Sequence, residues 1–149
     1  MEKTAVLVGS STGNTESVGE KIVEKLGNGA KLINVADASV AQIEDCKNLI
    51  LGTSTWGVGD LQDDWEDFLP KLAQADLNGK TVALFGLGDA ESYYDSFVDG
   101  IGTIYEEIKD KGIRPSKYLF LKQTFINKLR QKFFEIFGGC NVDVFHDVL

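Results

Sequence analysis

The first segment that could bind a ligand is rich in hydroxyl side chains and lies between an apolar run and a helical pattern that starts near Glu16. Backbone N–H groups in the first turn of a helix, together with Ser and Thr hydroxyls, can donate to phosphate oxygens. The segment has no lysine and lacks both GxxxxGK[ST] and GxGxxG, so it predicts a monophosphate site, although a simple helix-capping cluster remains an open alternative. Its residues are Ser10, Ser11, Thr12, Gly13, Asn14 and Thr15.

Two later segments each place an aromatic residue among glycines and polar residues. Trp56 lies in the segment after the third apolar run, and Tyr93 lies in the segment after the fourth. Two such aromatic side chains can stack on the two faces of a flat conjugated ring, or each can simply pack against the core. The candidate ring-binding residues are Ser54, Thr55, Trp56, Gly57, Leu87, Gly88, Asp89 and Tyr93.

Short apolar runs and helical patterns alternate along the chain and must position these segments. The runs, rich in β-branched residues, are 4–9, 30–35, 48–53 and 80–86, and each predicts a buried strand. Apolar residues recur at helical spacing from Val18 to Leu26 and from Ile101 to Ile108. This alternation predicts a doubly wound α/β fold with a parallel sheet covered on both faces, and 149 residues suit one domain, 1–149.

Taken together, the three segments resemble the loops that bind flavin mononucleotide (FMN) in the flavodoxin family. The resemblance rests on SSTGNT, on TWGVGDLQDDWEDF (55–68) and on FGLGDAESYYDSF (85–97). It implies a three-layer α/β/α fold whose five parallel strands have the order 2-1-3-4-5, with the ligand at the carboxyl ends of the strands. Flavodoxin is itself a standard example of that placement.

The resemblance also implies a role for each ring-binding residue. Trp56 would cover one face of the flavin ring and Tyr93 the other, while Gly88 and Asp89 would meet its polar edge. Gly57 would provide a peptide that turns over beside the ring, because glycine reaches positive φ without a Cβ penalty. Replacing Gly57 by Ala is then expected to make the first one-electron potential more negative, by the equivalent of about 1 kcal/mol.

The C-terminal part, 113–149, is atypical for this family. The resemblance covers residues 4–112 and is to the long-chain flavodoxins, but their insertion in the last strand is not recognisable. Residues 118–121 suit a fifth strand, and an apolar i, i+4 stripe from Phe125 to Phe137 suits a last helix. The hypothesis is that this tail arose by a frameshift or by replacement of an ancestral end.

The resemblance implies a one-electron carrier and not an enzyme. The net charge of −8 argues against nucleic-acid or anionic-membrane partners and predicts redox proteins with basic surfaces. We expect a cytoplasmic protein, because the sequence shows no signal peptide or membrane span, and we expect it to be a monomer. We expect no metal site, because Cys46 and Cys140 lack the spacing of metal ligands. Crowded carboxylates near the ring would lower its second potential; they are Asp60, Asp63, Asp64, Glu66, Asp67, Asp89, Glu91 and Asp95.

Three other functions stay open at this point. A small FMN-dependent NAD(P)H quinone reductase would share the fold but would need a nicotinamide-binding segment, which the sequence does not suggest. A receiver domain would need acidic residues where this chain has Ser10, Ser11, Ser54 and Thr55. An inactive remnant that binds no flavin is the last alternative.

Overall fold

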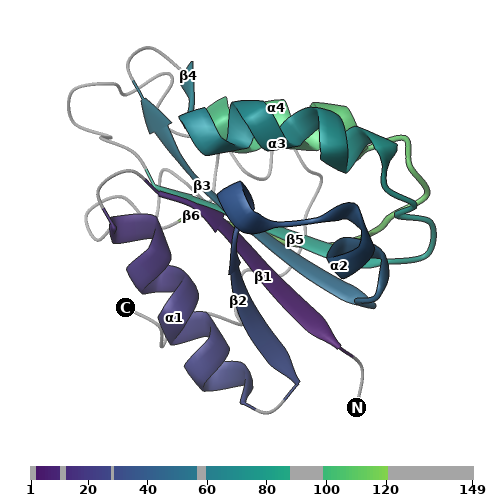
Figure 1. Ribbon diagram of the computed structural model, residues 1–149, viewed down its shortest axis with the longest axis horizontal. Helices are drawn as coiled ribbons and strands as arrows, with labels where there is room; N and C mark the ends of the chain where they lie inside the picture. Colours follow the sequence, from purple (N-terminus) through teal and green to yellow (C-terminus); the bar gives the residue numbers. More distant parts are fainter. Residues whose placement is uncertain (1–2, 11–12, 28, 57–59, 88–98, 121–149) are drawn as a thin grey trace.

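A computed structural model describes residues 3–10, 13–27, 29–56, 60–87 and 99–120 of the chain (Figure 1). In this part, β1 (Thr4–Gly9), β2 (Ala30–Asn34), β3 (Asn48–Trp56), β5 (Thr81–Leu87) and β6 (Arg114–Phe120) pair in parallel in the order β2-β1-β3-β5-β6. A two-residue strand, β4 (Asp60–Leu61), pairs antiparallel with the end of β3. The predicted 2-1-3-4-5 order of parallel strands is therefore confirmed.

Helices cover both faces of the sheet and give three layers. Helix α1 (Asn14–Leu26) lies on one face, and α3 (Asp63–Gln74) and α4 (Asp99–Ile108) lie on the other (Figure 1). The short elements η1 (Val35–Asp37) and α2 (Val40–Glu44) connect β2 to β3. No helix in the described part of the chain is long and apolar enough to cross a membrane.

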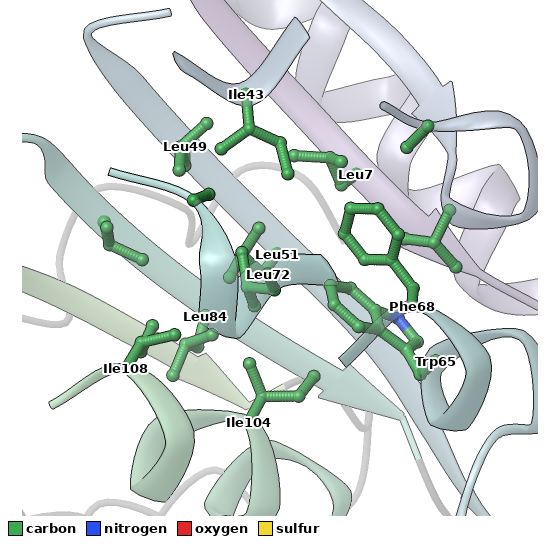
Figure 2. Close-up of a cluster of buried hydrophobic side chains, with 14 of the residues drawn as sticks. Leu7, Ile43, Leu49, Leu51, Trp65, Phe68, Leu72, Leu84, Ile104 and Ile108 are labelled. Carbon is green, nitrogen blue, oxygen red and sulfur yellow. The ribbon is translucent and has the colours of Figure 1, made fainter. Parts of the chain in front are cut away.

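The two faces of the sheet have separate apolar cores, as a parallel sheet buried on both sides requires. Side chains alternate along β1, so that Val6 and Val8 pack with α1 whereas Leu7 packs with α3 and α4. Figure 2 shows the second core, where Trp65 and Phe68 of α3 meet the sheet and their rings make an edge-to-face contact with centroids 5.7 Å apart. This packing fixes α3 directly on the sheet.

Element ends differ in places from the sequence-based expectation. Strand β3 runs to Trp56 and not to Thr53, because β4 supplies it with pairing partners, so Ser54, Thr55 and Trp56 lie at a strand end and not in a loop. Strand β2 ends at Asn34, whose side-chain Oδ1 accepts from the Ala36 N–H over 3.0 Å and starts a 3-10 turn.

Other ends move by a few residues. Helix α1 starts at Asn14, slightly before Glu16, and β6 covers 114–120 where the sequence suggested 118–121. The helix expected from Phe125 to Phe137 lies outside the described residues.

Candidate functional site

The carboxyl ends of β1, β3 and β5 bring the predicted ligand-binding segments together. In register, Gly9 of β1 lies opposite Thr53 of β3, and Thr53 and Ser54 lie opposite Gly86 and Leu87 of β5. Because the three strands are parallel neighbours, the chain leaves the sheet at one common edge after each of them. Ser10, Ser54 and Leu87 therefore lie at the same edge of the sheet.

The structure describes only part of the predicted site. The backbones of Asn14, Thr55, Trp56 and Leu87 are placed at the start of α1 and at the ends of β3 and β5. The predicted site residues that lie outside the described part are Ser11, Thr12, Gly57, Gly88, Asp89 and Tyr93.

The N-terminus of α1 differs from those of α2 and α3. Ser39 and Gln62 cap α2 and α3 through their side chains, whereas the N-cap of α1 is Gly13, with φ 87° and no side-chain hydrogen bond to the first turn. Glycine favours this left-handed conformation because it has no Cβ. At α1 the N-cap residue itself thus leaves the first-turn donors, which a side chain satisfies in α2 and α3, to another partner, and the helix dipole there favours an anion.

The hydroxyl of Thr15, in the first turn of α1, is buried. Thr15 is 1% exposed, and its Oγ1 has no hydrogen-bond partner among the described residues. An unsatisfied buried hydroxyl costs about 1–3 kcal/mol. A ligand with acceptor oxygens at the start of α1 would remove that cost, so the donor set suits a phosphate.

The side chain of Ser10 is bonded to Gly13, the N-cap residue of α1. Its Oγ accepts a hydrogen bond from the Gly13 N–H over 3.0 Å. A hydroxyl that accepts one bond can still donate its own hydrogen. Ser10 thus both holds the N-cap residue of α1 and can add a donor for an anion.

The side chain of Thr53 holds the backbone at the end of β3. This residue is fully buried, and its Oγ1 donates to the carbonyl of Ser54 over 2.9 Å. Its neighbours in register, Gly9 and Gly86, carry no side chains. The hydroxyl therefore fixes the Ser54 carbonyl at the point where the candidate ring-binding segment begins.

Carboxylates gather beside this edge, at β4 and in the first turns of α3. Asp60, Asp63, Glu66 and Asp67 are exposed, and Asp64 is half-buried. Within the described residues, no group of three or more His, Cys, Asp or Glu side chains could hold a metal ion. The described part of the edge carries negative charge on its outer side and neutral hydroxyl and amide donors at the start of α1.

Sequence reasoning missed two residues that support this edge, Gln62 and Trp65. The Trp65 indole Nε1–H donates to the Gly52 carbonyl over 2.7 Å, and Gln62 Oε1 accepts from the Trp65 backbone N–H over 3.2 Å. The available signal was a polar residue three positions before the first apolar residue of an amphipathic helix, which is typical of an N-cap. Nothing in the sequence indicates that the indole would reach β3.

Comparison with known proteins gives a consistent set of relatives. The family model described as Flavodoxin matches residues 6–144, which extends past residue 112, where the resemblance seen in the sequence ended. A flavodoxin from Buchnera aphidicola is 44% identical over 110 residues, which cover 73% of this chain and 64% of that protein. Flavodoxin 1 from Escherichia coli is 43% identical over 113 residues, covering 75% of this chain and 64% of that protein.

Solved structures agree with these relatives. Oxidised Flavodoxin 2 from Bacillus cereus superposes with a TM-score of 0.72 at 29% identity, covering 80% of this chain and 83% of that one. Fusobacterium nucleatum flavodoxin bound to flavin mononucleotide superposes with a TM-score of 0.69 at 31% identity, covering 80% and 70%. The matched part of this chain spans slightly less than two thirds of the Buchnera and Escherichia relatives. The family match over residues 6–144 and the shared fold show that this chain belongs to the flavodoxin family.

Proposed function

We propose that this chain binds one FMN non-covalently and carries single electrons between redox proteins, without being an enzyme itself. The observation that carries the proposal is the buried Thr15 hydroxyl, which has no partner among the described residues, at the glycine-capped start of α1. Membership of the flavodoxin family supports FMN as the ligand, since the Fusobacterium nucleatum relative is bound to that nucleotide.

The phosphate would be held at the start of α1. The Thr15 hydroxyl and the first-turn N–H groups, which the N-cap residue Gly13 does not cap, would donate to its oxygens. Neutral donors suit a phosphate monoester that also contacts water. The residues proposed for this role are Ser10, Ser11, Thr12, Gly13, Asn14 and Thr15.

The ring would lie beside the ends of β3 and β5. Trp56 and Tyr93 are proposed to cover its two faces by stacking. The residues proposed for its edges are Ser54, Thr55, Gly57, Leu87, Gly88 and Asp89. Support comes from the register that brings Ser54 opposite Leu87 at one edge of the sheet.

When bound, FMN would supply the redox chemistry, since it accepts one or two electrons. The part of the polypeptide is to hold the ring, limit its contact with water and set its potential. The carboxylates from Asp60 to Asp67 would disfavour added negative charge nearby and so lower the potential.

The same carboxylates support redox partners with basic surfaces. The formal charge of −8 would steer such partners and keep copies of this chain apart, so we propose a monomer. The unpaired Cys46 thiol suits the reducing cytoplasm, where we place the protein. The continuous family match over 6–144 supports a single domain over 1–149.

Titration of the purified full-length chain with FMN, followed by quenching of flavin fluorescence, tests the proposal. We expect saturable quenching at one FMN per chain, and unchanged fluorescence at saturating protein would overturn it. The loaded protein should not oxidise NAD(P)H in the presence of a quinone unless a reductase is added. Steady oxidation without a reductase would identify a quinone reductase instead.

A further inference from the structure

Trp65, at the start of α3, is bonded directly to the central strand of the sheet. Its indole Nε1–H donates to the Gly52 carbonyl over 2.7 Å, and the side chain is fully buried. Gly52 lies in register with Val8 of β1 and Phe85 of β5, two residues before Ser54. A side-chain donor on a helix thus holds the strand just before it reaches the candidate site.

Hydrogen bonds fix both described parts of the chain between Gly52 and Trp65, namely 52–56 and 60–65. The end of β3 pairs with β4, where Thr55 lies opposite Leu61 and Trp56 opposite Asp60. Gln62 follows β4, and its Oε1 accepts from the Trp65 backbone N–H over 3.2 Å. Protein bonds therefore hold the described parts of this segment, 52–56 and 60–65, without a ligand, which is how preorganised sites reduce the cost of binding.

The same two side chains also contact the end of β1. A Cβ placed on Gly9 would lie 2.3 Å from Gln62 Oε1 and 2.5 Å from Trp65 Cδ1. Gln62 and Trp65 thus fill the space of a side chain on the residue just before Ser10. Trp65 therefore contacts Gly9 and Gly52, which lie one and two residues before the starting points of two segments, Ser10 and Ser54.

We propose that Trp65, held by Gln62, is a positioning residue that sets the distance between these two starting points. Trp65 thereby determines whether the phosphate and the ring of a single FMN molecule are held at the same time. The inference rests on the proposed function. A ligand held at two points gains affinity from the second contact only when the geometry allows both contacts at once. A small displacement of one contact point relative to the other therefore removes the affinity that FMN gains from having both a phosphate and a ring.

The test compares two ligands on the same protein. Riboflavin has the ring but no phosphate, so the ratio of its Kd to that of FMN measures how well the two contacts combine. Trp65→Phe keeps a buried aromatic ring but removes the N–H that reaches Gly52. We expect its Kd for FMN to rise at least tenfold and its Kd for riboflavin to rise less than threefold, so that the ratio falls.

Gly9→Ala disturbs the same contact from the side of β1. The new methyl group would displace Gln62 and Trp65 without removing a hydrogen-bond donor, and we expect the same fall in the ratio. If Trp65→Phe fails to fold, as judged by circular dichroism, the Gly9→Ala result decides the question.

Leu72→Ala is the matched control. Leu72 is fully buried on the same helix, about two turns further along, so its truncation weakens the fold through a cavity. We expect its ratio to equal that of the wild type. A wild-type ratio in the Trp65 and Gly9 variants, or an equal loss of both ligands, overturns the positioning role alone. A wild-type protein that binds neither flavin overturns the proposed function itself.

Discussion

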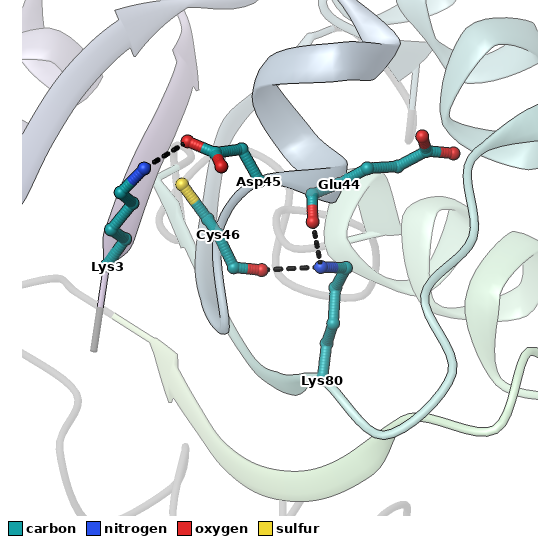
Figure 3. A network of polar contacts seen from close by, with 5 residues as sticks. All are labelled: Lys3, Glu44, Asp45, Cys46 and Lys80. Carbon is teal, nitrogen blue, oxygen red and sulfur yellow. Dashed lines mark hydrogen bonds and ion pairs between the residues drawn. The ribbon is translucent and has the colours of Figure 1, made fainter.

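The ammonium group of Lys80 lies against the C-terminal end of α2, where its Nζ donates to the Glu44 carbonyl over 2.8 Å (Figure 3). The same Nζ also donates to the Cys46 carbonyl, and Lys80 is only 9% exposed. Carbonyl groups at a helix C-terminus lack partners within the helix and carry partial negative charge. Lys80, which immediately precedes β5, thus holds the connection between α2 and β3 at the amino ends of the strands.

Lys80→Met is expected to lower the free energy of unfolding by about 2 kcal/mol, because it leaves two carbonyls without a charged donor. Urea denaturation of the flavin-free protein measures this change. Lys47→Met is the control: Lys47 is exposed, so a change below about 0.5 kcal/mol is expected. If the Lys80→Met protein is as stable as the wild type, the cost of burying the ammonium group equals the stabilisation from its two hydrogen bonds.

The same substitution is expected to have opposite effects on stability at two buried threonines, Thr15 and Thr53. Thr15 Oγ1 has no partner among the described residues, whereas Thr53 Oγ1 donates to the Ser54 carbonyl. Thr15→Val should therefore stabilise the flavin-free protein by about 1 kcal/mol, and Thr53→Val should destabilise it by about 1 kcal/mol. Thermal unfolding without flavin distinguishes the two cases.

The proposed phosphate contact adds a second expectation for Thr15→Val. Loss of one hydrogen bond to a charged group is expected to weaken FMN binding about tenfold, since such bonds contribute about 1.5–3 kcal/mol. Fluorescence titration measures the affinity. A variant that is more stable and still binds FMN with wild-type affinity would remove Thr15 from the phosphate site.

The sequence predicted the parts of this fold that depend on local patterns. β1, bounded by Thr4 and Gly9, matches its predicted range because a continuous apolar run between polar and glycine residues is sufficient to define a buried parallel strand. The predicted end of β3 was wrong because Trp56 is held in the strand by pairing with Asp60 of β4, a contact that the residues of β3 alone do not determine.

The support of the site could not be predicted for a similar reason. The hydroxyls of Ser10 and Thr15 are visible in the sequence as potential phosphate donors. The bond from Trp65 to Gly52 depends on how α3 packs against β3, and a tryptophan in an amphipathic helix indicates only that it is buried. Tertiary packing, and not residue type, decides which carbonyl the indole meets.

The Lys3–Asp45 ion pair predicts how one carboxyl titrates. The hydrogen bond from Lys3, 2.6 Å long, and its charge hold the pKa of Asp45 below the ordinary value of 3.8 (Figure 3). The same bond raises the pKa of Lys3 above 10.5. In Lys3→Met we expect the pKa of Asp45 to return toward 3.8, as followed by NMR of its side-chain carboxyl carbon.

The sign of the effect on stability follows from these two shifts. The Asp45 contribution is lost as pH falls through its lowered pKa, and the Lys3 contribution is lost as pH rises through its raised pKa. Any stability difference between the wild type and Lys3→Met should therefore appear only between these limits. It should also shrink in high salt, because both side chains are exposed.

Substitutions at Gly52 and Phe85, on the α1 face of the sheet, are expected to have strongly coupled effects on stability. A Cβ on Gly52 would lie 2.1 Å from Phe85 Cζ, and Phe85 is buried, so the ring has little room to move. Gly52→Ala is expected to destabilise the protein by about 2–3 kcal/mol through overpacking. Phe85→Leu alone should also destabilise it, because it removes part of a buried ring.

The double variant should be more stable than the sum of the two single effects allows, because the smaller side chain at position 85 makes room for the new methyl group. We expect a favourable interaction energy of about 1 kcal/mol or more in a double-mutant cycle measured by urea denaturation. Additive effects would show that the sheet relieves the clash by shifting its backbone at Gly52, and the bond from Trp65 to the Gly52 carbonyl would then be disturbed as well.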